Sequence, residues 1–260
     1  MIFLQAIYVI WQRELIHYIR DKTRIISTLV QPLIFLAIFG TGLRQTLAQA
    51  NFGIDFLQFM YPGIIAISVT GVAFSSTIST VWDREFGFLK EILVAPIPRT
   101  TIAIGKILGA TTIGVIQALI LLILAPFIGI SIHLFILPKL LFFILLLSFA
   151  VSGIGLLIAS LMTTTESFGF LMQLLISPMF LLSGAFFPLT AVPKWISVLS
   201  KINPLTYGID ALRQIILSSQ ISSEVIQSIT LYPIHIDALF LIAFSAVMII
   251  AAVYAFNRRG

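Results

Sequence analysis

Six long stretches of this chain contain no Asp, Glu, Lys or Arg, and they restrict its fold more than any other feature of the sequence. The stretches are residues 25–43, 56–82, 107–138, 140–165, 167–193 and 238–257. A helix crosses the hydrocarbon of a bilayer with about 20 apolar residues, and a charge at the bilayer centre costs about 2.5 to 3.5 kcal/mol on insertion scales. The sequence therefore predicts an all-α integral membrane protein. Its six transmembrane helices are expected near residues 25–43, 57–80, 106–130, 138–162, 168–188 and 236–256.

The composition agrees with this class. Charged residues make up 10% of the chain and its mean hydropathy is +1.11, whereas a soluble chain carries roughly 25% charged residues. Long apolar runs rich in Phe favour helices over an outer-membrane barrel, whose strands alternate apolar and polar residues. Six spans of about 20 residues leave only loops and short helices. Residues 1–260 are therefore expected to form a single transmembrane domain without a soluble catalytic unit.

Lys and Arg are distributed unequally between the two sides of the predicted membrane. Ten of the fifteen basic residues fall in the first, third and last extramembrane segments, and five fall on the opposite side. Because Lys and Arg mark the cytoplasmic side, both termini are predicted to be cytoplasmic. The basic residues lie at the ends of spans rather than in one patch, so a nucleic-acid partner is not expected.

Residues 1–24 have the pattern of an amphipathic helix. Aromatic and aliphatic residues such as Trp11 share one face, and Arg13, His17 and Arg20 share another. This segregation predicts a helix that lies in the cytoplasmic membrane interface. The helix is expected to act as an anchor, and to have a mechanical role in addition if a soluble partner docks beneath it.

Two further segments are longer than simple connections between spans. Residues 83–100 mix acids and bases with an apolar stripe and end at prolines, which predicts a short amphipathic helix at the cytoplasmic surface. The alternative is a solvated loop whose charges only set the topology. Residues 189–235 predict an external helical hairpin, re-entrant or lying on the surface, with short helices at 193–199 and 205–217 separated by Asn203 and Pro204.

Residues that would carry catalysis are missing from the predicted spans. The three histidines are scattered, and Gly105-Lys106 lacks the earlier glycine of a phosphate-binding loop. We therefore expect neither an enzyme nor a metal or cofactor site, and any energy for uphill transport must come from another polypeptide. Hydroxyl side chains crowd the span at 57–80, Ser68 among them, and they serve either helix packing or the lining of a substrate path.

Three local motifs point to a known family. The first is Leu29-Val-Gln-Pro-Leu-Ile-Phe-Leu followed by Phe39-Gly-Thr-Gly-Leu43, and the second is the segment from Arg84 to Arg99 followed by Gly105-Lys106. The third combines Ser183-Gly-Ala-Phe-Phe-Pro188 with Asn203-Pro-Leu-Thr-Tyr207 and continues through Asp210 to Arg213. Together with the predicted topology, these motifs resemble the type-2 ATP-binding-cassette (ABC) exporter permeases, and within them the bacterial drug-exporter branch. Phe86 departs from the family pattern, in which a charged or polar residue is common, and the second cytoplasmic loop at 162–167 is short.

The resemblance implies roles for particular residues. It makes residues 83–100 the coupling element that docks on a separate ATPase, and residues 1–24 the connecting helix against the same ATPase. The implied coupling residues are Arg84, Glu85, Phe86, Gly87, Leu89, Glu91, Leu93, Pro96 and Arg99, and those of the connecting helix are Arg13, His17 and Arg20. The implied pathway residues are Phe35, Phe39, Ser68, Phe74, Met172 and Phe180. The implied residues of the external signature are Pro204, Tyr207 and Arg213.

The resemblance also implies partners. A second copy of the chain, or a related permease, is expected to complete a pathway for a drug, a glycan or an amphipathic, lipid-like molecule. ATP and magnesium are expected to bind to the partner ATPase, and no cofactor is expected on this chain. The chain is expected to contact membrane lipid and to lie in a bacterial inner membrane. A reading of a different class stays open, namely an ATP-independent channel or a membrane scaffold that recruits proteins.

Overall fold

The computed structural model describes residues 2–42, 56–89, 97–218, 221 and 223–259, and over these ranges the chain is helical and contains no β-strand. The α-helices are α1 (Ile2–Arg20), α2 (Lys22–Gly42), α4 (Phe56–Glu85), α6 (Arg99–Leu124), α7 (Leu137–Leu161), α8 (Thr165–Leu181), α9 (Lys194–Ser200), α10 (Pro204–Leu217), α11 (Ser223–Ile229) and α12 (Ile234–Arg259). Short 3₁₀ segments cover Ala125–Ile128, Leu134–Ile136 and Leu189–Ala191.

A helix lies at each of the six positions predicted for a span. Four helical stretches are long and apolar enough to cross a membrane: Phe56–Glu85, Arg99–Ile128, Leu134–Leu161 and Ile234–Arg258. The apolar helix α8 is shorter, with 17 residues. The all-helical membrane architecture is therefore confirmed, while the count of six spans stays a prediction.

Two helix boundaries differ clearly from the sequence prediction. The fifth helix was expected to reach residue 188 but ends at Leu181, because the chain turns after it and Gly184 has a φ of 74°, a left-handed conformation that cannot continue an α-helix. The third was expected from residue 106 but begins at Arg99, directly after the extended Pro98. Pro98 precedes the first residue of α6, and its extended backbone keeps the helix from beginning any earlier.

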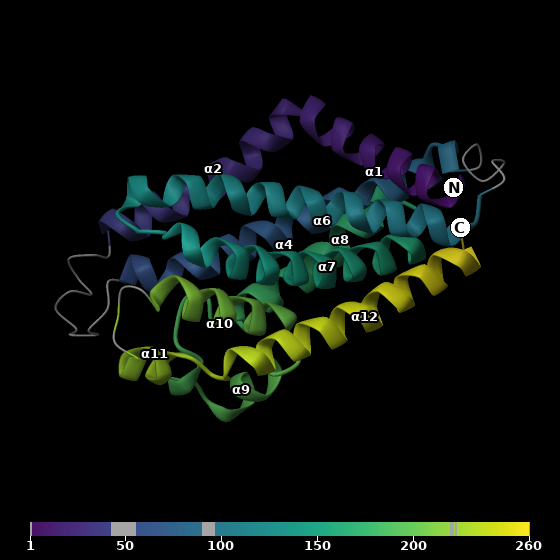
Figure 1. Cartoon of the computed structure of the whole chain (residues 1–260). Coiled ribbons are helices and arrows are strands. Elements are labelled where there is room, and N and C mark those ends of the chain that lie inside the picture. Colours follow the sequence, from purple (N-terminus) through teal and green to yellow (C-terminus); the bar gives the residue numbers. More distant parts are fainter. Residues whose placement is uncertain (1, 43–55, 90–96, 219–220, 222, 260) are drawn as a thin grey trace.

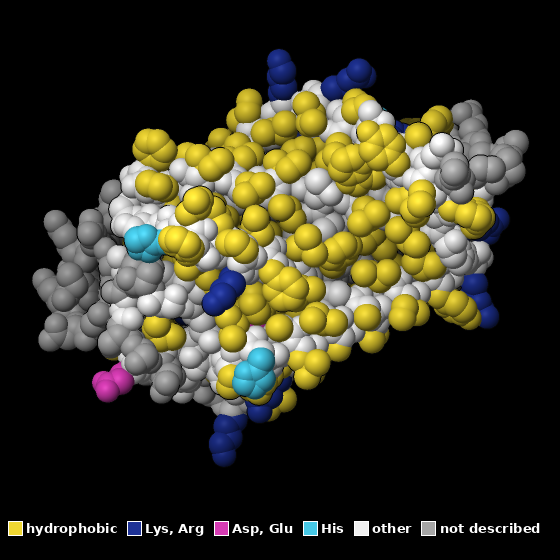
Figure 2. Space-filling model, in the orientation of Figure 1, with side chains coloured by type: hydrophobic (Ala, Val, Ile, Leu, Met, Phe, Trp, Pro, Cys, Tyr) yellow, Lys and Arg dark blue, Asp and Glu magenta, His cyan; other side chains and the backbone are white. Residues whose placement is uncertain are grey.

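The packing is densest around α4 and α7. The helices α6 and α7 pack against each other and against both α4 and α12, and α10 packs on α4, α7 and α12 (Figure 1). The large side chains that are completely enclosed, such as Tyr61, Phe74 and Leu147, come from these central helices. By contrast, α2 and α8 contact mainly α4, so they form the less enclosed side of the bundle. Figure 2 shows hydrophobic side chains over most of the visible face, with Lys and Arg mainly at its edges.

The two ends of the bundle differ in content. The helix α1, the last residues of α4, the first residues of α6 and the end of α12 gather at one end, here called the termini end (Figure 1). Helices α9, α10 and α11 gather toward the other, here called the hairpin end. The predicted hairpin helices match α9 and α10, but α11 was not predicted.

Candidate functional site

Four charged side chains from three helices meet at the termini end, and we call them the charge cluster. Arg13 and Glu14 come from α1, Asp83 from α4 and Lys106 from α6. The Oδ2 atom of Asp83 accepts from both Arg13 and Lys106, each at 2.6 Å, and Oε1 of Glu14 lies 3.3 Å from the same two cations. The cluster therefore connects α1 to α4 and α6.

The side chains of the charge cluster are largely buried, so their charges must balance. The Lys106 and Glu14 side chains are 2% and 6% exposed, and those of Asp83 and Arg13 are 12% and 24% exposed. An unpaired charge in such a place costs several kcal/mol, so the two cations require two carboxylates to balance them. Burial lowers the pKa of Arg13, but the carboxylates of Asp83 and Glu14 outweigh that effect, and the pKa lies above its ordinary value.

Close helix contact holds α1 against α6 beside the cluster. A Cβ atom placed on Gly109 would lie 2.7 Å from Cβ of Glu14, and one placed on Gly105 would lie 2.8 Å from Cβ of Ile10. Only glycine permits this approach, which is typical of small residues at helix interfaces in membranes. The indole N–H of Trp11 donates to Oγ1 of Thr112 at 2.9 Å across the same interface between α1 and α6.

The connecting-helix residues divide between two environments. Arg13 is half-buried in the charge cluster, whereas His17 and Arg20 are exposed. The buried face of α1 includes Glu14 and Tyr18, and this polar contribution was not predicted. No signal in the sequence reveals it, because Glu14 and Lys106 are 92 positions apart.

Two predicted coupling residues, Arg84 and Glu85, make contacts within the chain. The Arg84 guanidinium donates to the backbone oxygens of Ser160 at 3.0 Å and Met162 at 2.6 Å, at the end of α7. The Glu85 carboxylate accepts from the backbone N–H of Thr165 at 2.9 Å, at the start of α8. Both placements suit the helix dipole, with a cation at a C-terminus and an anion at an N-terminus. They tie the end of α4 to the short turn between α7 and α8.

The remaining coupling residues that the structure describes differ in exposure. Phe86 is 78% exposed, whereas Leu89 is buried at 4% in a cluster with Ile102 and Phe256. Gly87, with a φ of 80°, turns the chain between the two apolar residues. The Arg99 guanidinium donates to the backbone oxygen of Asn257 at 3.0 Å, near the end of α12. Predicted residues Glu91, Leu93 and Pro96 lie outside the described residues.

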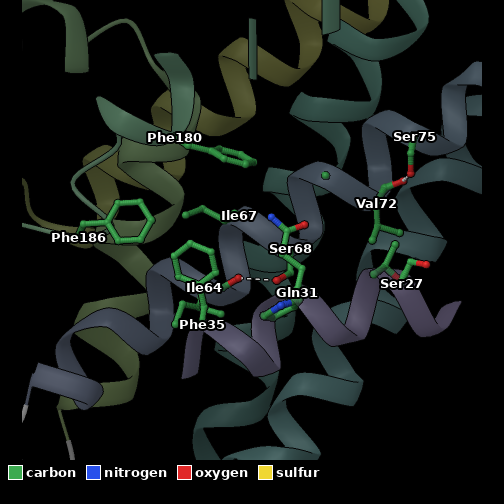
Figure 3. A pocket seen from close by; sticks show the side chains of 13 residues that line it. Ser27, Gln31, Phe35, Ile64, Ile67, Ser68, Val72, Ser75, Phe180 and Phe186 are labelled. Carbon is green, nitrogen blue, oxygen red and sulfur yellow. Dashed lines mark hydrogen bonds between the residues drawn. The ribbon is translucent and has the colours of Figure 1, made fainter. Parts of the chain in front are cut away.

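A pocket with a volume of about 310 Å³ opens between α2, α4 and α8, and we call it the inter-helix pocket (Figure 3). Phe35, Phe180 and Phe186 form an aromatic part of its lining. Its polar residues come from α2 and α4 and are Ser27, Thr28, Gln31, Ser68 and Ser75. The lining is therefore amphipathic.

Three of the predicted pathway residues, Phe35, Ser68 and Phe180, line this pocket. Phe74 and Met172 are instead buried in the core of the chain. Phe39 belongs to α2, and its side chain lies outside the described part. Around the pocket, α2 and α8 expose large apolar side chains, among them Ile34 at 50% and Leu174 at 61%.

At the hairpin end, Arg213 is buried and holds three parts of the chain together. Its guanidinium donates to the backbone oxygens of Gly184 at 2.8 Å and Phe59 at 3.4 Å, and its Cζ lies 3.9 Å from the centroid of the Phe59 ring. Burial lowers the pKa of Arg213 to about 10, so the residue keeps its charge at neutral pH. These contacts fix α10 to α4 and to the turn after α8.

The start of α10 explains the other two signature residues. Pro204 is the first residue of the helix, and the preceding Asn203 accepts from the N–H of Leu205 at 3.1 Å while its amide donates to the oxygen of Met179 at 2.7 Å. Proline at this position and an N-cap Asn both favour helix initiation. The Tyr207 ring stacks on Phe240 of α12 with centroids 3.7 Å apart.

Two more residues of α10 bind the chain that follows it. The Asp210 carboxylate accepts from the N–H groups of Leu231 at 2.9 Å and Tyr232 at 3.0 Å. Gln214 donates to the oxygen of Tyr232 at 2.9 Å and to Asp237 at 3.2 Å. Thus α10 is held on every side, and its polar groups serve structure. Among the described residues, no group of His, Asp or Glu could hold a metal ion.

The chain is similar in sequence to known membrane permeases. The sequence profile of the family described as ABC-2 type transporter matches residues 5–217. The chain is 31% identical over 214 residues to the putative transport permease ycf38 of Cyanophora paradoxa, covering 81% of this chain and 74% of that protein. It is 27% identical over 217 residues to the inner membrane transport permease YadH of Escherichia coli strain K12, covering 80% and 81%. It is also 33% identical over 174 residues to the probable multidrug ABC transporter permease YbhR of that strain, covering 64% and 46%.

The family match extends from α1 to α10, and it includes the charge cluster, the inter-helix pocket and the buried Arg213. A profile that covers this much of the chain defines its family. The chain belongs to the ABC-2 type transporter family of membrane permeases.

Proposed function

We propose that this chain is the membrane subunit of an exporter whose ATP is hydrolysed on separate ATPase chains docked at the termini end. The charge cluster carries the proposal, because it joins α1 to α4 and α6 beside Phe88, whose ring centroid lies 5.4 Å from Cζ of Arg13. A displacement of α1 or of the chain at Phe88 would therefore move two long helices as rigid bodies. The chain itself is non-catalytic in this scheme, and ATP and Mg²⁺ bind to the partner ATPase.

The proposed pathway forms between two permease chains that face each other across the inter-helix pocket. The amphipathic lining of the pocket supports this arrangement, because polar groups on an open side of the bundle are better placed against a second permease than against lipid. A second copy or a related permease facing the pocket would also cover Ile34 and Leu174. The aromatic and hydroxyl lining suits an amphipathic substrate, either a drug or a lipid-like or glycan-bearing molecule. In this scheme both termini are cytoplasmic and the membrane is a bacterial inner membrane.

The ATPase contact is tested by co-purification from the native membrane, followed by mass spectrometry and an ATPase assay of the eluate. We expect Phe86→Ser to lower recovery of an ABC ATPase at least tenfold, since a large apolar side chain that is 78% exposed contributes to binding rather than to the permease fold. Phe135→Ser is the matched control, because Phe135 is 95% exposed and lies just before the start of α7, whereas the proposed docking surface is near the end of α7. Equal ATPase recovery from the two variants would contradict docking at Phe86. Substrate flux through liposomes without any ATPase would favour the channel reading.

The permease pair is tested separately by cysteine cross-linking in membranes. The chain contains no cysteine, so a single Ile34→Cys or Leu174→Cys variant reports only on its own position. We expect oxidant to produce covalent dimers from these variants and not from Leu239→Cys, which is 69% exposed on α12. Dimers from the α12 variant alone would place the contact on a different face.

A further inference from the structure

A second, larger cavity opens at the hairpin end, away from the inter-helix pocket. It has a volume of about 650 Å³ and is bounded by the start of α7, the end of α10, α11 and the start of α12. We call it the basic cavity. Its lining residues include Lys139, Gln214, Ser218, Thr230 and His235.

The charges around this cavity are unbalanced. Lys139 and His235 line it, and none of the described residues that line it is acidic. The carboxylates of the surrounding helices do not line the cavity. Asp210 accepts from the backbone N–H groups of residues 231 and 232, Asp237 is fully buried and accepts from Gln214, and Glu224 is exposed in the first turn of α11. The hydroxyl and amide groups of Ser218, Thr230 and Gln214 donate to other groups of the chain, so the cavity presents chiefly the ammonium of Lys139 and the imidazole of His235 to a ligand.

Its position in the bundle restricts the occupant. Lys139 stands immediately before the charge-free stretch that begins at residue 140, and Asp237 immediately before the one that begins at residue 238. Within the next turn or two, α7 exposes Phe142 at 47% and α12 exposes Leu239 at 69%. The cavity thus lies where the lipid-facing apolar surface ends, which is the depth of lipid headgroups. A lysine ammonium at this depth can pair with the phosphate of a lipid headgroup through charge-assisted hydrogen bonds.

We propose that the basic cavity binds the phosphate headgroup of an anionic membrane lipid, with Lys139 and His235 as its principal contacts. The lipid's acyl chains would lie along the exposed apolar surface of α7 and α12. The bound headgroup joins the start of α7 to the hairpin, since Thr230 and Tyr232 line the same cavity as Lys139. The site is separate from the proposed transport pathway, and its function does not depend on the proposed ATPase contact.

The test uses the purified full-length chain, delipidated in detergent, with phosphatidylglycerol as the probe. Native mass spectrometry measures bound lipid, and the thermal unfolding midpoint measures its effect on the fold. A cation near an anionic headgroup contributes roughly fivefold in affinity. We therefore expect Lys139→Gln/His235→Gln to weaken phosphatidylglycerol binding by at least about fivefold and to abolish the lipid-dependent rise in the midpoint. The matched control is Lys194→Gln/Lys201→Gln, which removes two exposed cations from the same end outside the cavity.

Several results would overturn the proposal. Unchanged binding in the first double variant would do so, and so would equal losses in both double variants, which would indicate general surface charge. Inorganic phosphate that binds as tightly as the lipid would assign the site to a free anion. If the first double variant does not accumulate, Ser218→Glu adds a negative charge to the lining and is expected to weaken lipid binding, while Lys139→Arg is expected to retain it.

Discussion

The charge cluster makes a quantitative prediction about its two central members, Asp83 and Lys106. Lys106→Met leaves two buried carboxylates with one cation, Arg13, and Asp83→Asn leaves two cations with one carboxylate, Glu14. Each single change strands one buried charge, and breaking a buried pair in this way costs about 3 to 5 kcal/mol. The double variant removes one charge of each sign, so the neutral pair of Arg13 and Glu14 remains. We expect it to be less destabilised than the sum of the single variants by about 2 kcal/mol or more.

Equilibrium unfolding in mixed micelles with increasing SDS measures these free energies of unfolding for the wild type, both single variants and the double variant. Lys194→Met serves as the control for loss of a lysine, because Lys194 is exposed on α9, and it is expected to change stability by less than about 0.5 kcal/mol. If the effects of Asp83→Asn and Lys106→Met add to within about 0.5 kcal/mol, the two residues do not interact. That result would refute the cluster as a mechanical joint between α4 and α6.

Three further contacts are tested in the same unfolding assay by four substitutions, one of which is a control. Gly109→Ala is expected to destabilise the chain because its Cβ would lie 2.7 Å from that of Glu14. The control is Gly169→Ala, which has nothing within 4 Å of its Cβ and is expected to stabilise the chain by up to about 1 kcal/mol through helix propensity. A gain in stability at both positions would contradict the close packing of α1 on α6. Arg213→Met is expected to cost about 2 to 4 kcal/mol by leaving two backbone oxygens without their donor, and a cost below about 1 kcal/mol would contradict its role. Asn203→Ala is expected to cost about 1 kcal/mol or more as the cap of α10, and a neutral result would show that Pro204 alone starts the helix.

The helices were predictable from the sequence because hydrocarbon excludes charge, and the charge-free stretches follow the helices closely. The prediction was wrong where local backbone chemistry ends a helix inside an apolar stretch, as at Leu181, which precedes the left-handed Gly184. It also missed α11, which is short and polar, with Glu224 in its first turn.

The site was less predictable, because the partners of charged residues are set by packing between distant segments. The family resemblance implies that Glu85 faces a partner, but its carboxylate accepts from the backbone N–H of Thr165, 80 positions away. A charge reversal at Glu85 would therefore disturb the start of α8 as well as any docking surface. The exposed Phe86 is a cleaner probe of the proposed ATPase contact than either Arg84 or Glu85.

The order of synthesis gives the contacts of α10 another meaning. This helix leaves the ribosome before α12, yet Asp210 and Gln214 bond to residues 231, 232 and 237, and Tyr207 stacks on Phe240. A nascent chain that stops at residue 230 consequently carries a buried-type carboxylate with no donor for it. We expect α10 to reach its final packing only after residues 231–240 are in place, so the hairpin is expected to close late in biogenesis. A premature stop codon directly after residue 230 is expected to disturb the packing of α10 as well as to remove α12.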